Sequence, residues 1–339
     1  MDLSLGILDQ SPIRTGSTAA ESIAETLALA RLADRLGYQR YWFSEHHSAG
    51  GFAGSVPEIL IGRVAMETRR IRVGSGGVML PNYSPLKVAE CFRMLEILHP
   101  GRVDLGVGRA AGGMPRAARA LGTSELEGPA FDEKLRLLLD FLFERLDPAH
   151  PFHRVRAVPG GGGAPEVWLL GSGVESAERA AEQGISFCYA HFFYPGGEEA
   201  MDVYRRRFRP SPWLREPRGA IAVSVVCAES AAEARQLAIP SACWGTRLVQ
   251  GEGGTFPSPD EVEAQRPTWT PDETALIEAR LDQTVTGTPA TVRDALGALT
   301  EAYGVRELLA VTITHDPAVR QRSYTWLAEA FGLEEARQA

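Results

Sequence analysis

Short apolar runs alternate with longer stretches of helical periodicity along most of this chain. Eight of the runs are continuous rather than alternating, which is typical of strands in a parallel sheet buried on both faces. They span residues 3–8, 38–43, 71–80, 102–107, 166–170, 185–189, 221–227 and 308–313. Each run is followed by a segment with the period of a helix, and eight such units predict an α/β fold, a single (β/α)8 TIM barrel.

Two stretches depart from the regular spacing. Residues 148–165 are rich in proline and glycine, and residues 246–286 separate the seventh unit from a helix that begins with Thr288 and Pro289. We expect both stretches to be insertions in barrel loops. Residues 1–339 then form one domain, although the length alone would also accommodate two.

The composition argues against several classes of protein. With 44% hydrophobic and 23% charged residues, the chain has the makeup of an ordinary globular protein. Its net charge of −8 argues against a nucleic-acid partner, and no apolar run approaches the ~18 residues of a membrane span. The first residues carry no basic export signal, and the four cysteines are widely spaced, as in a reduced interior. We therefore expect a cytoplasmic enzyme.

The second strand ends in a group of polar residues. Its apolar run passes directly into Ser44, Glu45, His46 and His47. In an extended backbone alternate side chains point to opposite faces, so only one of the two histidines is expected to face a given pocket. Glu45 and a histidine fit a catalytic site, and they fit equally well a hydrogen-bonded pair that only holds a loop.

Polar side chains also follow other strands. Gln10 follows strand one, Tyr83 follows strand three, Arg109 follows strand four and His191 follows strand six. Functional groups of TIM barrels collect at the carboxyl ends of the strands. These four side chains are therefore candidates for the same site as His46.

The turn after strand five has the features of an anion site. It contains Gly171, Ser172 and Gly173, with Ser176 where a helix is expected to begin. Free amides at a helix N-terminus bind anions, and small residues clear the approach, so together with Arg109 the turn predicts a cradle for one phosphate. A plain strand-to-helix turn capped by serine fits the same residues equally well.

Other cofactor and metal motifs are missing from the sequence. The G-x-G at Gly106 and Gly108 does not continue as G-x-G-x-x-G, because one residue too many precedes Gly112, and no phosphate-binding G-K-[ST] occurs. Bound nicotinamide dinucleotide or nucleoside triphosphate is thus not indicated. His46 and His47 cannot both face one metal from a strand, and no H-E-x-x-H is present, so we predict no metal site.

Four segments, taken together and in this order, match one known family. They are W-F-S-E-H-H at residues 42–47, R-V-G-S-G-G-V-M-L-P at 72–81, H-P-G-R-V-D-L-G-V-G-R at 99–109, and the turn from Gly171 to Ser176. The combination resembles the bacterial luciferase-like flavin monooxygenases, over roughly residues 3–227.

The resemblance implies an activity and its partners. Such a barrel binds reduced FMN (FMNH2) supplied by a separate NAD(P)H-dependent flavin reductase, and uses O2 to oxygenate a small organic substrate. Hydroxylation, epoxidation and Baeyer–Villiger oxidation are all compatible, and the similarity at residues 8–12 and 81–87 suggests the members that tailor natural products. Members commonly pair through the helices after strands two and three, here residues 56–68 and 85–98, which implies a homodimer.

The resemblance also implies roles for individual residues. His46 matches the catalytic histidine and is expected to act in a pocket with Gln10, Tyr83 and His191. His191 and Glu45 are further catalytic candidates. The residues implied to bind the cofactor are Gly76, Gly77, Arg109, Gly171, Ser172, Gly173 and Ser176. Gly76 and Gly77 are expected beneath the flavin ring, joined by a cis peptide bond.

Two alternative functions keep the same barrel. One is hydride transfer with the deazaflavin coenzyme and without oxygen, and the other is flavin binding without catalysis. Intact Glu45, His46 and Arg109 argue against the second. The chain resembles the family less at residues 110–120 and after Thr246, so we expect these segments to determine substrate selectivity.

Overall fold

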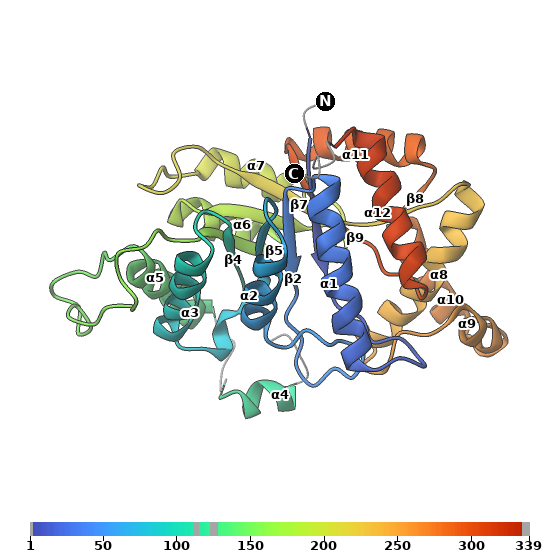
Figure 1. Cartoon of the computed structure of the whole chain (residues 1–339), viewed down its shortest axis with the longest axis horizontal. Helices are drawn as coiled ribbons and strands as arrows, with labels where there is room; N and C mark the ends of the chain where they lie inside the picture. The colour runs from blue at the N-terminus through green and yellow to red at the C-terminus, as the bar shows by residue number, and fades with distance from the viewer. Residues whose placement is uncertain (1–2, 111–114, 123–127, 334–339) are drawn as a thin grey trace.

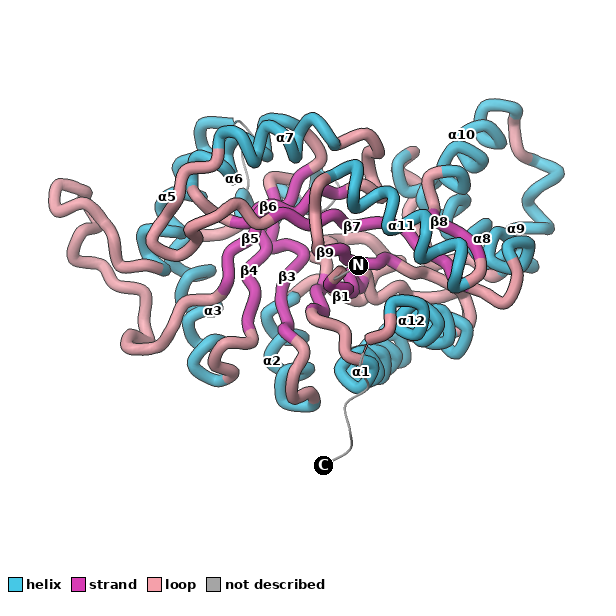
Figure 2. The backbone as a smooth tube through the Cα atoms, turned by 90° about the horizontal axis from the view of Figure 1, so that it is seen from above, coloured by secondary structure: helices cyan, strands magenta, loops and turns pink. Residues whose placement is uncertain are grey.

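The structure is a computed structural model that describes residues 3–110, 115–122 and 128–333. Eight parallel strands close into a barrel in the order β1, β2, β3, β4, β5, β6, β7, β9, and β9 pairs again with β1, with helices around them (Figures 1 and 2). The strands are β1 Ser4–Asp9, β2 Arg40–Phe43, β3 Arg72–Met79, β4 Val103–Gly108, β5 Glu166–Gly171, β6 Ser186–Ala190, β7 Gly219–Cys227, β8 Val285–Gly287 and β9 Glu307–Val311. The predicted (β/α)8 barrel is confirmed.

The helices begin and end largely where local capping rules place them. Helix α1 follows Thr18, which forms a capping box with Glu21, and it ends at Gly37 in the left-handed conformation. None of the described helices is long and apolar enough to cross a membrane. The helices are α1 Ala19–Leu36, α2 Pro57–Glu67, α3 Pro85–Leu98, α4 Pro115–Ala120, α5 Gly128–Leu142, α6 Val174–Gln183, α7 Glu198–Arg207, α8 Ala231–Val249, α9 Pro259–Gln265, α10 Pro271–Asp282, α11 Pro289–Tyr303 and α12 Pro317–Phe331, with short 3-10 turns η1 Leu80–Asn82 and η2 Arg266–Thr268.

Alternate residues of the strands pack on opposite sides of the barrel wall. Trp42 and Trp168 fill the interior with their ring centroids 5.3 Å apart, whereas Tyr41 and Phe43 pack between the wall and the outer helices. The same alternation continues past the ends of the strands. It decides which residues reach the mouth, the end of the barrel formed by the carboxyl ends of the strands.

A network of ion pairs seals the barrel at the end opposite the mouth. Arg40 is 1% exposed and pairs with Asp104 at 2.5 Å, with Glu166 at 2.9 Å and with Glu307. Asp104 is fully buried and also accepts a hydrogen bond from Trp42 Nε1 at 2.8 Å. Buried charges are tolerated only when each has its partners. Paired charges therefore close this end of the barrel.

The segment between β7 and α11 differs from the prediction. We expected the insertion to begin at residue 246, but the helix that precedes it continues to Val249 and packs on α10 and β8 rather than only on the barrel. Strand β8 was not predicted, because a three-residue strand has no apolar run of its own; it pairs with the end of β7. Residues 231–287, which we call the mouth insertion, extend to one side of the ring of helices in Figure 2.

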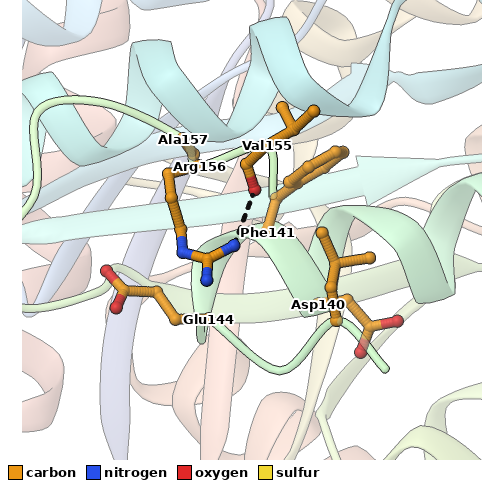
Figure 3. Close-up of a pocket in the computed structure, with 7 residues that line it drawn as sticks. Asp140, Phe141, Glu144, Val155, Arg156 and Ala157 are labelled. Atoms are coloured by element: carbon orange, nitrogen blue, oxygen red, sulfur yellow. Dashed lines mark hydrogen bonds between the residues drawn. The ribbon is translucent and has the colours of Figure 1, made fainter. Parts of the chain in front are cut away.

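The other predicted insertion, residues 148–165, lies at the opposite end of the barrel, because it connects the end of α5 to the start of β5. With α5 it borders a shallow hollow (Figure 3), in which Arg156 donates a hydrogen bond to the carbonyl oxygen of Val155 at 3.2 Å. The hollow is lined by Asp140, Phe141, Glu144, Leu146, Val155, Arg156 and Ala157. It lies away from the strand ends that carry the candidate site.

Candidate active site

His46 lies at the mouth, on the same side of β2 as Trp42. Its ring stacks on Phe52 with centroids 3.9 Å apart, and its Nδ1 lies 3.2 Å from the hydroxyl of Ser44. Burial, with a smaller effect from the neighbouring His47, lowers the pKa of His46 to about 4. The imidazole is therefore neutral at pH 7 and can accept a proton.

Glu45, His47 and Tyr83 form a separate cluster on the outer side of β2. The buried carboxylate of Glu45 lies 2.6 Å from His47 Nε2, and it accepts hydrogen bonds from the Tyr83 hydroxyl at 2.8 Å and from the amide of Met79 at 3.2 Å. Burial, together with the charge of Glu45, raises the pKa of Tyr83. The cluster ties the end of β2 to the end of β3, and the structure does not bring Tyr83 to the face that holds His46.

His191 also lies on the outer side of the wall. Residues 187, 189 and 191 share one face of β6, and Phe187 and Tyr189 pack in the outer core. Nδ1 of His191 lies 2.8 Å from the hydroxyl of Tyr303, which also accepts a hydrogen bond from the amide of Gly197 at 2.7 Å. The expected pocket shared by His46 and His191 is thus not formed, because the parity of the strand turns His191 toward α11.

The β3 residues Gly76 and Gly77 form a bulge without side chains. The peptide bond between them is cis, which confirms the expectation from the family resemblance, and the register with β4 shifts between Ser75 and Val78. A Cβ atom on Gly76 would lie 2.5 Å from Leu8, and one on Gly77 would lie 2.8 Å from the carbonyl oxygen of Gly106. The contact at Gly77 is with the backbone, so only glycine fits there, whereas a side chain at Gly76 would require the end of the Leu8 side chain to move.

The turn after β5 presents the free N-terminus of helix α6. The helix begins at Val174, two residues before the predicted Ser176, and its N-cap Gly173 provides no side-chain hydrogen bond. One carboxylate oxygen of Glu175 lies 3.3 Å from Nη1 of Arg109 and 3.3 Å from Nη1 of Arg179. Two guanidinium groups therefore converge beside uncapped amides, an arrangement that binds anions.

Sequence reasoning missed Glu175 and Arg179 at this turn. Their i, i+4 spacing is typical of an ordinary exposed ion pair on a helix. Only the folded chain shows that Arg109, which comes from another strand end, meets the same carboxylate. The charged groups at the turn are thus more numerous than the sequence indicated.

Sequence reasoning also missed His315, which follows β9. It has the same parity as Leu309, Val311 and Ile313, all of which pack in the interior cluster, and this parity is the signal that the sequence contains. Its ring stacks on Phe256 with centroids 6.3 Å apart. Nε2 of His315 is buried and has no hydrogen-bond partner among the described residues.

A row of aromatic rings links the two histidines of the mouth. From His46 it runs to Phe52, then to Trp244 at 4.6 Å, to Phe256 at 5.3 Å, and so to His315. Trp244 and Phe256 come from the mouth insertion, and Gln10 stands at the end of β1, which lies between β2 and β9 in the barrel. The rings of Phe52, Trp244 and Phe256 thus form one apolar surface, here called the aromatic wall, with an imidazole at each end.

Comparisons with known proteins show the family of the chain. The sequence matches the model of the luciferase-like monooxygenase family over residues 3–307. The chain belongs to this family. This luciferase-like monooxygenase is 45% identical to the uncharacterized protein YwcH of Bacillus subtilis (strain 168) over 335 residues, 97% of this chain and 99% of the relative. The crystal structure of apo-MsnO8 superposes with a TM-score of 0.89 at 41% identity and covers 98% of this chain and 100% of that chain.

One similar luciferase-like protein has a named reaction. N-acetyl-S-alkylcysteine monooxygenase of Bacillus subtilis (strain 168) is 36% identical over 329 residues, 96% of this chain and 97% of the relative. Two structures below 25% identity share the fold: the oxygenating constituent of 3,6-diketocamphane monooxygenase from Pseudomonas putida in complex with FMN (TM-score 0.71, 22% identity, 99% and 100% coverage), and an F420-dependent secondary alcohol dehydrogenase (TM-score 0.69, 14% identity, 97% and 99% coverage).

The expected selectivity loop of this luciferase-like monooxygenase is described in part. Residues 111–114 lie outside the described residues, and α4 follows them on the mouth side of the barrel (Figure 1). The second expected selectivity segment, after Thr246, supplies Phe256 and His315 to the mouth. In the described part of the chain no three or more of His, Cys, Asp and Glu are grouped as a metal site.

Proposed function

We propose that this member of the family is an FMNH2-dependent two-component monooxygenase that uses O2 to oxygenate a small organic substrate. The observation that supports it best is the convergence of Arg109 and Arg179 on the uncapped N-terminus of α6. A phosphate that displaces the Glu175 carboxylate meets both guanidinium groups and the free amides. The absence of a nicotinamide motif in the sequence favours delivery of FMNH2 by a separate NAD(P)H-dependent reductase.

The residues present fit FMN. Arg109, Ser172, Gly173 and Ser176 would hold the phosphate, and the side-chain-free bulge of Gly76 and Gly77 would lie beside the flavin ring. Bound FMNH2 supplies the electrons that activate O2. The aromatic wall excludes water from the mouth, which favours oxygen transfer to an organic substrate over loss to solvent.

His46 acts as the proton acceptor of the site. The hydroxyl of Ser44 lies 3.4 Å from the backbone oxygen of Asp9 and donates its hydrogen bond there. The Ser44 oxygen is then free to accept a hydrogen bond from Nδ1–H of His46. This arrangement leaves Nε2 of His46 unprotonated. Because the pKa of His46 is low, Nε2 is unprotonated throughout the neutral range, which is the state that a proton acceptor needs.

Glu45 supports this geometry from the other side of β2. It touches the ends of β2 and β3 and no group at the mouth among the described residues, so we assign it a positioning role. His191, on the outer side of β6, has no part in the proton transfer proposed here.

The experiment that tests the function compares two reduced cofactors. The protein is mixed with FMNH2 or with reduced deazaflavin, and the oxygen consumed and the substrate oxygenated are measured. N-acetyl-S-benzylcysteine is the first substrate to try, because a relative is named for N-acetyl-S-alkylcysteine. Oxidation of the deazaflavin by substrate without O2 uptake would replace the proposal with hydride transfer. If the substrate is converted with neither FMNH2 nor the deazaflavin, the result would favour a non-catalytic flavin-binding protein.

The variant His46→Ala separates catalysis from binding. We expect it to fold and to bind FMNH2, but to release hydrogen peroxide in place of product. The amount of product formed per FMNH2 oxidised should fall by a factor of about 10² or more, the usual contribution of acid–base catalysis. Unchanged coupling would transfer the role to another group, with His315 the first candidate because its Nε2 is unpartnered at the same mouth.

We propose further that the protein forms a homodimer through α2 and α3. Ile59 is 69% exposed and Met66 75% exposed on α2, and Leu98 is 60% exposed on α3. Apolar side chains gathered on neighbouring helices favour burial against a second copy. Sedimentation should show a dimer at micromolar concentration for the wild type and a monomer for Met66→Asp, and a monomeric wild type would refute the proposal.

A further inference from the structure

Arg280 of α10 has no partner for its charge among the residues that the structure describes. Its side chain makes no hydrogen bond or ion pair with any described residue, although it is partly buried. Burial lowers the pKa of Arg280, and the group in the described chain that offsets this effect is the phenol of Tyr194, not a carboxylate. A guanidinium group that is partly withdrawn from water gains from a partner that accepts its hydrogen bonds, and an anion is the strongest such partner.

Arg280 stands beside the mouth. Its Nη1 lies 3.3 Å from the position that a Cβ on Gly245 would occupy, so the absence of a side chain at Gly245 makes room for the guanidinium group. Gly245 adjoins Trp244 on α8 and lies three residues before Leu248, and both of these pack at the mouth. Helical periodicity thus places Arg280 between the aromatic wall and the body of the mouth insertion.

Aromatic rings lead from the mouth toward the surface on the side of Tyr194. Phe192 packs against the interior cluster, Phe193 follows at 6.4 Å and Tyr194 at 4.8 Å from Phe193. Phe193 is 50% exposed and Tyr194 is 57% exposed. Exposed aromatic side chains that continue a buried apolar surface mark a place for an apolar ligand.

We propose that Arg280 and the ring series of Phe192, Phe193 and Tyr194 form a substrate subsite for an organic carboxylic acid with an apolar body. The guanidinium group pairs with the carboxylate, and the rings cover the apolar part as it enters the mouth toward His46. The inference names the substrate class of the same site, so as a statement about turnover it rests on the proposed function.

The test measures binding to the full chain without flavin or oxygen. N-acetyl-S-benzylcysteine and its carboxamide are titrated calorimetrically into the wild type, Arg280→Gln and Arg280→Lys. Arg235→Gln is the matched control, since Arg235 joins the same two helices but pairs with Glu278 at 2.5 Å and Asp282 at 3.2 Å. Circular dichroism and thermal unfolding establish that each variant is folded.

We expect the wild type to bind the acid about tenfold or more tightly than the carboxamide, because a charge-assisted pair is lost in the amide. Arg280→Gln should weaken binding of the acid by a similar factor and abolish the preference, Arg280→Lys should restore part of it, and Arg235→Gln should behave as the wild type. Equal binding of acid and carboxamide by the wild type, no binding of the acid at millimolar concentration, or a preference that survives in Arg280→Gln would each overturn the subsite.

The binding test of the subsite can fail or succeed independently of the test of the proposed monooxygenase activity. A protein that binds the acid through Arg280 but consumes no O2 with FMNH2 keeps the subsite and loses the monooxygenase proposal. A protein that couples FMNH2 oxidation to oxygenation of the carboxamide and acid alike keeps the function and loses the subsite.

Discussion

The low pKa of His46 makes the stability of the protein depend on pH in a defined direction. Burial lowers the pKa from 6.5 to about 4. The unfolded chain therefore binds a proton at His46 more readily than the folded chain does. Stability from this group is fully present above pH 6.5 and is lost as the pH falls from 6.5 toward 4.

The size of the effect follows from the two pKa values. At about 1.36 kcal/mol per pH unit, the difference between 6.5 and about 4 limits the total loss to roughly 3 kcal/mol, and linkage assigns about 2 kcal/mol of it to the interval from pH 7.5 to pH 5. Because other groups titrate in this interval, the effect of His46 must be isolated by comparison with His46→Gln, which keeps a polar side chain but cannot be protonated.

The assay is urea unfolding of wild type and His46→Gln at pH 7.5 and pH 5.0, with His150→Gln as a control outside the barrel. We expect the wild type to lose about 2 kcal/mol more unfolding free energy than His46→Gln between the two values. The control should lose as much as the wild type. Equal losses in wild type and His46→Gln would show that the imidazole is not held neutral by burial, and the assignment of His46 as proton acceptor would fail with it.

Three further outcomes test other parts of the site and the barrel. Arg109→Ala should weaken FMNH2 binding by about tenfold or more in equilibrium titration and hardly affect reduced riboflavin, since charge-assisted hydrogen bonds to phosphate are lost; equal weakening of both would contradict the phosphate role. Asp104→Asn should lower the unfolding free energy by about 1 to 3 kcal/mol, because it removes the fully buried carboxylate that pairs with Arg40 and leaves that guanidinium group only its two glutamate partners, and an unchanged unfolding free energy would contradict the network. His315→Leu should leave thermal stability unchanged or raise it by up to about 2 kcal/mol, because a buried unpartnered nitrogen is removed, and a marked loss would indicate a hidden partner.

Much of the site could be predicted from the ends of strands. His46, Arg109 and the turn at Gly173 could be located in this way, because the segments that follow parallel strands lie at the mouth end of the barrel and the parity of the strand tells which of their side chains face the interior. The cis bond between Gly76 and Gly77 followed from the family resemblance. The association of Tyr83 with Glu45 could not be predicted, because the hydroxyl reaches a carboxylate 38 residues away only after the barrel closes.

The sequence by itself determined the barrel. Apolar runs of strand length, the helical segments between them and the capping residues at their ends are local properties, and they specify eight strands and the alternation of inner and outer side chains. The same alternation would have placed His315 at the mouth and His191 outside it, had it been followed past the ends of the strands.

Only the tertiary structure decided what covers the mouth. Trp244 meets Phe52 because the mouth insertion packs against a loop almost two hundred residues earlier in the chain. Within the insertion, the packing of α10 on α8 leaves Arg280 without a hydrogen-bond or ion-pair partner among the described residues. Such contacts depend on shape and on the competition among many possible neighbours, and no local periodicity encodes them. The fold could therefore be predicted from the sequence, whereas the surface that would select a substrate is formed by residues that only folding brings together.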